Sequence, residues 1–276
     1  MRINSGEVKL NLIWKEDPRI SSKQPIMFLH GFTGNSSEWH FFFDKVNPHF
    51  NPIAIDLIGH GESDSPNELN HYTILSITKQ FDSIIKKIPN KIILHGYSMG
   101  GRVLLNYLFL TSLINKIKAI ILESTSCGIE NPIERKAREN SDLTLAEKIL
   151  KNGVENFIDD WMQKPIFSGL KNLESSEYTS FVKKKKLNSK IGLANSLKGF
   201  GTGKMDYLGN RLNEIEIPVL LLNGENDQKF VSINKKMKSR FINAKHVIIE
   251  NCGHNIHLEK PSEFLNFVNH FLTKIG

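Results

Sequence analysis

Cysteine is scarce in this sequence of 276 residues, which contains only Cys127 and Cys252. Two cysteines are too few for a disulfide framework, and neither belongs to a CxxC pair or to another spacing that would hold zinc. We therefore expect both thiols to be reduced and the protein to hold no metal.

Long apolar runs are also missing. The first twenty residues lack the apolar core of a signal peptide, and no stretch approaches the roughly 18 uninterrupted apolar residues of a membrane helix. These absences predict a cytoplasmic protein without a membrane partner.

Basic residues outnumber acidic ones, but they lack the arrangement of a nucleic-acid-binding surface. The formal net charge of +7 is spread along the chain apart from four lysines at 183–186, which a solvated helix face explains. No basic stripe interleaved with aromatic residues accompanies them. We expect no nucleic-acid partner, whereas a small anionic substrate is compatible with the charge.

The chain does contain alternating signals for buried strands and amphipathic helices. Within 73–89, for example, apolar residues recur at steps of three and four, as on one face of a helix. This alternation predicts an α/β fold with a mostly parallel sheet flanked by helices, and residues 3–14 alternate like an antiparallel edge hairpin. Short apolar runs bounded by turn-forming residues lie at 25–31, 52–59, 91–96, 118–124 and 217–224.

The alternation stops between residues 124 and 203. Charged, helix-forming sequence fills this stretch without a convincing strand. We interpret 124–203 as a helical cap inserted into a core domain formed by 1–123 and 204–276. The core pattern resumes after the cap, with a strand at 245–250 and an amphipathic helix that begins after Pro261.

The segment Gly96-Tyr97-Ser98-Met99-Gly100 follows one of the expected strands directly and opens a helical segment. This is the context of a nucleophile elbow, in which the serine backbone is strained and the glycines allow a tight turn. A GxSxG pattern alone is weak, but its position between strand and helix favours Ser98 as a nucleophile or base.

A serine hydroxyl needs a histidine to take its proton, and that imidazole needs a carboxylate to orient it. Asp227 and His254 follow the last two strands in the chain order that this fold uses. We assign both to the triad, keep Glu123 as the alternative acid, and interpret His257 as a packing or substrate-contact residue.

The loop His30-Gly31-Phe32-Thr33-Gly34 follows the strand PIMFL (25–29) and matches the loop that donates one oxyanion-hole amide. The second amide comes from the residue after the nucleophile. The predicted donors are therefore the backbone N–H groups of Phe32 and Met99.

These motifs are typical of the α/β-hydrolase superfamily, which the sequence resembles over essentially its whole length. More narrowly, it resembles the 2-succinyl-6-hydroxy-2,4-cyclohexadiene-1-carboxylate synthases of menaquinone biosynthesis. The cap segments and the GHNxHxE pattern are the most specific features. The narrower resemblance rests on LHGFTGNSSEW (29–39), DLIGHGES (56–63), GYSMGGR (96–102), ERKAREN (134–140), FIDDWMQKPIF (157–167), LKGFGTGK (197–204), GENDQKF (224–230) and GHNIHLE (253–259).

The resemblance implies a lyase that eliminates pyruvate from a tricarboxylate without cofactor or metal. It also implies cationic residues that bind the carboxylates. Where members of the family have a cap arginine, this chain places Lys186, which cannot form the same bidentate contact. The substrate-binding residues that we expect are Tyr97, Arg102, Arg135, Arg138, Trp161 and Lys186.

Other interpretations remain open at this point. Arg135 and Arg138 could instead form a solvated helix face with neighbouring glutamates, and Trp161 could belong to the core of the cap. A serine carboxylesterase or a carbon–carbon bond hydrolase would use the same triad, and a non-catalytic receptor could use the same fold. We expect a monomer or a weak homo-oligomer.

Overall fold

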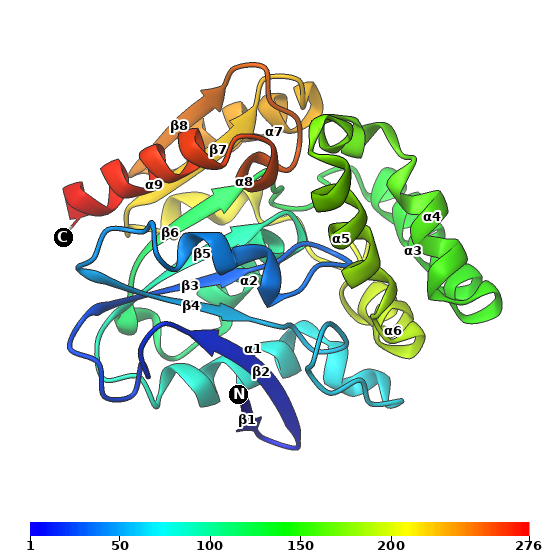
Figure 1. Cartoon of the computed structure of the whole chain (residues 1–276), viewed down its shortest axis with the longest axis horizontal. Coiled ribbons are helices and arrows are strands. Elements are labelled where there is room, and N and C mark those ends of the chain that lie inside the picture. Colours follow the sequence, from blue (N-terminus) through cyan, green and yellow to red (C-terminus); the bar gives the residue numbers. More distant parts are fainter. Residues whose placement is uncertain (276) are drawn as a thin grey trace.

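The computed structural model of the protein describes residues 1–275. Its centre is an eight-stranded sheet in the order β1-β2-β4-β3-β5-β6-β7-β8, in which β1, β2 and β4 pair antiparallel and the other neighbours pair parallel (Figure 1). The expected parallel sheet with an antiparallel edge hairpin is confirmed. The strands are β1 (Arg2–Ser5), β2 (Val8–Trp14), β3 (Gln24–Leu29), β4 (Phe50–Ile55), β5 (Ile92–Tyr97), β6 (Ile117–Glu123), β7 (Val219–Gly224) and β8 (Ala244–Ile249).

Both faces of the sheet are buried, because apolar side chains alternate between two hydrophobic clusters. In β3, Met27 and Leu29 belong to the cluster that includes residues of α1 (Ile74–Ile85), α2 (Met99–Leu110) and α7 (Gln228–Arg240). Ile26 and Phe28 belong to the cluster that includes residues of α9 (Pro261–Ile275). Each such side chain contributes about 1.5–3 kcal/mol when fully buried. The central strands therefore consist almost entirely of apolar residues.

Four α-helices and two 3₁₀ helices lie between β6 and β7. The four α-helices and the first 3₁₀ helix, here called the cap helices, stand together at one end of the sheet (Figure 1). They share a separate hydrophobic cluster that includes Ile149, Ile158 and Leu193. Asn131 caps the first of these helices by accepting hydrogen bonds from two backbone N–H groups, and Gly153 ends it with a positive φ of 83°. These elements are α3 (Pro132–Asn152), α4 (Val154–Met162), η4 (Pro165–Asn172), α5 (Ser175–Lys186) and α6 (Lys190–Phe200).

Several short helices complete the described chain. None of the helices within 1–275 is long and apolar enough to cross a membrane. The remaining elements are η1 (Ser36–Phe42), η2 (Leu69–Tyr72), η3 (Ile114–Lys116), η5 (Gly209–Glu214) and α8 (Ile256–Glu259).

Candidate active site

Ser98 lies in the turn between β5 and α2, with a positive φ of 49° that is unusual for a non-glycine residue. The surrounding turn leaves no room for side chains at two neighbouring positions. A Cβ at Gly96 would lie 2.6 Å from the Cα of Gly101, and one at Gly100 would lie 2.7 Å from the carbonyl oxygen of Leu29. The glycines thus permit the strained turn that presents the Ser98 hydroxyl.

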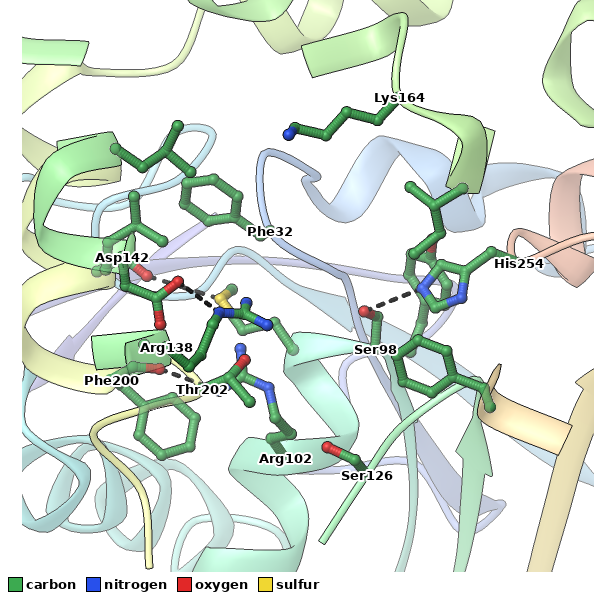
Figure 2. Close-up of a pocket in the computed structure, with 18 of the residues that line it drawn as sticks. Phe32, Ser98, Arg102, Ser126, Arg138, Asp142, Lys164, Phe200, Thr202 and His254 are labelled. Atoms are coloured by element: carbon green, nitrogen blue, oxygen red, sulfur yellow. Dashed lines mark hydrogen bonds and ion pairs between the residues drawn. The ribbon is translucent and has the colours of Figure 1, made fainter. Parts of the chain in front are cut away.

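Ser98, His254 and Asp227 form a continuous hydrogen-bonded chain. The Nδ1–H of His254 donates to Oδ2 of Asp227 at 2.6 Å, and Nε2 lies 3.2 Å from Oγ of Ser98 (Figure 2). Because a carboxylate is an acceptor, the proton of the neutral imidazole is on Nδ1, and Nε2 is free to accept the serine proton. This arrangement can increase the basicity of Ser98.

The loops that carry Asp227 and His254 are held together through their backbones. The N–H of Asn226 donates to the carbonyl of Cys252 at 2.8 Å. Gly224 lies so close to this second loop that a Cβ there would be 2.1 Å from the carbonyl oxygen of Gly253. The distance between acid and histidine therefore depends mainly on backbone contacts rather than on flexible side chains.

Two peptide groups beside Ser98 have their carbonyls fixed by buried side chains. The Nδ1–H of His30 donates to the carbonyl of Gly31 at 2.7 Å, and the Thr125 hydroxyl donates to the carbonyl of Ser98 at 2.7 Å. A trans peptide points its N–H opposite to its C=O. The amides of Phe32 and Met99 therefore point away from these anchors and are available to an acceptor.

A cavity of about 440 Å³ lies between this turn and the cap helices. Its lining includes Ser98 and His254, together with an unusual concentration of positive charge, while Asp142 is the one acidic residue among the lining residues within 1–275. A volume of this size suits a small-molecule ligand, and the charge favours an anion. The lining cations are Arg102, Arg138, Lys164, Lys185 and Lys229.

Arg102 lines this cavity from α2. Its guanidinium donates to the Phe200 carbonyl at 3.1 Å and lies 5.2 Å from the centre of the Phe200 ring. In the part of the chain that the structure describes, it has no acidic partner within ion-pair distance, whereas Arg138 pairs with Asp142 at 2.8 Å (Figure 2). Burial lowers the pKa of Arg102 to about 10, so this group is still cationic at neutral pH.

Comparison with known proteins agrees with this architecture. Residues 24–261 match the family described as alpha/beta hydrolase fold. The chain is 37% identical over 256 residues to a Bacillus subtilis protein provisionally named 2-succinyl-6-hydroxy-2,4-cyclohexadiene-1-carboxylate synthase, with 92% of each chain covered. It is 26% identical to the synthase of that name from Serratia proteamaculans, covering 91% of this chain and 94% of the relative. The structure of MenH from S. aureus superposes with a TM-score of 0.90 at 35% identity, covering 96% and 98% of the two chains.

The chain belongs to the α/β-hydrolase fold family and, within it, to these synthases. Structures of more distant members, such as an esterase from Exiguobacterium antarcticum at 18% identity and a TM-score of 0.78, share the fold alone.

Glu123, the alternative acid of the triad, contacts other histidines than His254. It is fully buried, and its carboxylate accepts from Nδ1 of His257 at 2.7 Å and lies 3.2 Å from Nε2 of His95. Burial alone would raise the pKa of Glu123, but the neighbouring histidines outweigh burial and lower it to about 2. Asp227, and not Glu123, is bonded to His254.

Two of the expected substrate-binding residues do not reach the cavity. Lys186 pairs with Asp159 at 2.6 Å on the outside of the cap, and Arg135 does not line the cavity either. Lys185 lines it instead, and its ammonium pairs with the buried carboxylate of Glu38 at 3.0 Å. Successive side chains on a helix point about 100° apart. An error of one position within the lysine run therefore assigns an outward-facing lysine to the cavity.

The other expected residues lie where a ligand could touch them. Tyr97, Arg102, Arg138 and Trp161 all line the cavity. The Trp161 ring meets the Phe32 ring edge-on at 5.6 Å, so this tryptophan serves both the cavity wall and the packing of the cap. No cluster of three His, Cys, Asp or Glu side chains suited to a metal occurs among residues 1–275.

Proposed function

We propose that Ser98, His254 and Asp227 catalyse the reaction of the synthase family by removing a proton from carbon. The substrate is 2-succinyl-5-enolpyruvyl-6-hydroxy-3-cyclohexene-1-carboxylate, and the products are pyruvate and 2-succinyl-6-hydroxy-2,4-cyclohexadiene-1-carboxylate, an intermediate of menaquinone biosynthesis. The protein is therefore a carbon–oxygen lyase that acts on a small molecule. The elimination requires neither water nor an acyl-enzyme.

The observation that best supports this role is that Arg102, in the cavity that contains Ser98, has no acidic partner among residues 1–275. A guanidinium without an acidic partner is a natural site for a ligand carboxylate. The substrate carries three carboxylates, and the surrounding lining supplies Arg138, Lys185, Lys164 and Lys229. An esterase for apolar esters would gain nothing from this charge.

The first step is transfer of a proton from substrate to enzyme. His254, oriented by Asp227, accepts the hydroxyl proton of Ser98 as Oγ removes the ring proton alpha to the succinyl ketone. The electrons of the broken C–H bond move into the ketone, which becomes an enolate. The amides of Phe32 and Met99 stabilise the enolate oxygen, and Met99 also begins α2, whose N-terminus favours negative charge.

The second step expels the leaving group. The enolate re-forms the ketone, the electrons shift through the ring alkene, and the carbon–oxygen bond to enolpyruvate breaks. The proton held by His254 neutralises the departing enolpyruvate, which becomes pyruvate. The triad thus returns to its starting protonation state.

The same proposal covers the roles of the two parts of the chain, the lysine that binds substrate, and the location and oligomeric state of the protein. Residues 124–203 act as a cap that carries Arg138, Trp161 and Lys185 to the substrate, over a core formed by 1–123 and 204–276. We assign Lys185, rather than Lys186, as the cap lysine that faces a carboxylate. The protein would act in the cytoplasm as a monomer or weak homo-oligomer, without a nucleic-acid or membrane partner.

Pyruvate release tests this function directly. Freshly generated substrate is supplied to wild type and to Ser98→Ala, pyruvate is coupled to lactate dehydrogenase, and p-nitrophenyl esters serve as the control substrate. We expect rapid release that falls by roughly a hundredfold or more in the variant, with little ester turnover. Release at the spontaneous rate, together with rapid ester or carbon–carbon bond cleavage, would show a hydrolase instead.

A further inference from the structure

The catalytic histidine lies in a turn whose backbone is held by one carboxylate. Glu259 accepts from the N–H of Gly253 at 2.6 Å through Oε2 and from the N–H of Asn255 at 3.0 Å through Oε1. These two amides flank His254 on either side. Both oxygens of a single side chain thus fix the peptides from which the His254 side chain projects.

The same carboxylate lies against the cap. A Cβ added to Gly169 of η4 would lie 1.9 Å from Oε2 and 2.4 Å from Cδ of Glu259. The neighbouring residues Ile166 and Phe167 of η4 line the catalytic cavity. Glu259 therefore occupies the contact between the turn of the catalytic histidine and a segment of the cap that faces the ligand.

The position is unfavourable for a carboxylate unless its hydrogen bonds are kept. Burial raises the pKa of Glu259, and the backbone bonds from Gly253 and Asn255 oppose that rise. The Glu259 carboxylate is thus partly desolvated at a position from which it bonds both amides. Charge-assisted bonds of this kind are stronger than neutral ones.

We propose that Glu259 is a positioning residue for the pyruvate elimination, which holds the His254 turn in place and ties it to η4 of the cap. It does not touch the reacting atoms. It acts through the orientation of His254 toward Ser98 and Asp227. The inference rests on the proposed roles of these three residues, so its test uses a reaction that needs the triad but not the proposed substrate.

Labelling of Ser98 by an alkyl fluorophosphonate provides that reaction, because its rate depends on activation of Ser98 by His254. The variants are Glu259→Ala and Glu259→Gln, with Glu263→Gln as the matched control, since Glu263 is an exposed glutamate in the first turn of α9. We expect labelling to slow by roughly ten- to a hundredfold in Glu259→Ala, less in Glu259→Gln, and not at all in Glu263→Gln. The downfield proton resonance of the His254–Asp227 bond should shift in the Glu259 variants alone.

The cap contact is tested separately with Gly169→Ala. Its new methyl group would displace the Glu259 carboxylate, so we expect slower labelling in the wild-type background and no further slowing in Glu259→Ala, where the space is free. Gly169→Ala in the wild-type background also tests the positioning role by itself if Glu259→Ala folds poorly, because it displaces the carboxylate without removing it.

The outcomes separate the two proposals. If wild type is not labelled at Ser98, the proposed triad fails. If wild type is labelled and folded Glu259→Ala reacts at the same rate with an unchanged proton resonance, the positioning role is wrong. Equal effects of Gly169→Ala in both backgrounds would overturn the link to the cap.

Discussion

The two sides of the catalytic cavity are built in different ways. On the core side, Ser98, Asp227 and His254 sit on short turns after strands, and backbone contacts such as that between Gly224 and Gly253 fix their spacing. On the cap side, the cations project from helices and depend on side-chain ion pairs, as Lys185 does with Glu38. The proposed catalytic residues are thus placed by backbone geometry, and the proposed substrate-binding residues by side-chain charge.

The largest predicted effect on activity comes from removing the carboxylate that orients His254. Asp227→Asn keeps the shape but removes the charge that holds His254 in its Nδ1–H form, so we expect kcat for pyruvate release to fall by roughly 10⁴-fold. The fall should appear in kcat rather than in KM, measured by steady-state assay. A mainly higher KM would mean that Asp227 binds substrate.

Arg102 should give the next largest effect on activity, because it is the cavity guanidinium without an acidic partner in the described chain. Arg102→Lys keeps a positive charge but not the bidentate geometry, and we expect kcat/KM to fall by about ten- to a hundredfold. The rate of Ser98 labelling by an alkyl fluorophosphonate, which has no carboxylate, serves as the control and should change little. Equal losses in both reactions would assign Arg102 to the structure of the elbow.

The neighbouring lysines of α5 offer a matched comparison within the cap. Lys185→Met leaves the buried Glu38 carboxylate with only Nε2 of His257, 3.9 Å away, as an ion-pair neighbour within residues 1–275. We therefore expect the free energy of unfolding to drop by about 3–5 kcal/mol, whereas Lys186→Met should cost about 1 kcal/mol or less. Denaturant unfolding measures both. The double variant Lys185→Met/Glu38→Gln should recover stability while KM stays high, which separates support of the fold from substrate recognition.

The buried carboxylate of Glu123 predicts how stability depends on pH. Its folded pKa of about 2 lies below the ordinary glutamate value near 4.3. A lowered pKa contributes stability above the unfolded value, and this contribution is lost as pH falls from about 5 toward 2. Unfolding curves over this range should show a smaller acid dependence in Glu123→Gln. An identical dependence in both proteins would contradict the low pKa.

The smallest predicted effect concerns the oxyanion-hole peptide. Thr125→Val keeps the shape of the side chain but removes its bond to the Ser98 carbonyl, which α2 also holds through the N–H of Arg102 at 3.2 Å. We expect a loss of about 1 kcal/mol of transition-state stabilisation, or roughly fivefold in kcat. Thr125→Ser should restore the rate. A failure to do so would point instead to packing of the Thr125 methyl group against Gly101, where an added Cβ would lie 2.7 Å from that methyl.

The contrast between backbone-positioned and side-chain-positioned residues also explains how much of the site could be predicted from the sequence. The strands, the elbow at Ser98 and the loops of Asp227 and His254 carry local signals, because tight turns require glycine and buried strands require apolar runs. The cap gave no such signal for Lys185, since four consecutive lysines do not reveal which one faces inward. Lys164 belongs to the cavity through the placement of η4, which only tertiary packing determines.

Deuterium substitution at the ring carbon alpha to the succinyl ketone tests the central claim most directly. Single-turnover release of pyruvate is compared for the protonated and deuterated substrates, and the Ser98 peptide is examined by mass spectrometry after quenching. Proton removal by Ser98 predicts a primary isotope effect and an unmodified Ser98. The absence of an isotope effect, together with a covalent adduct on Ser98, would contradict the account.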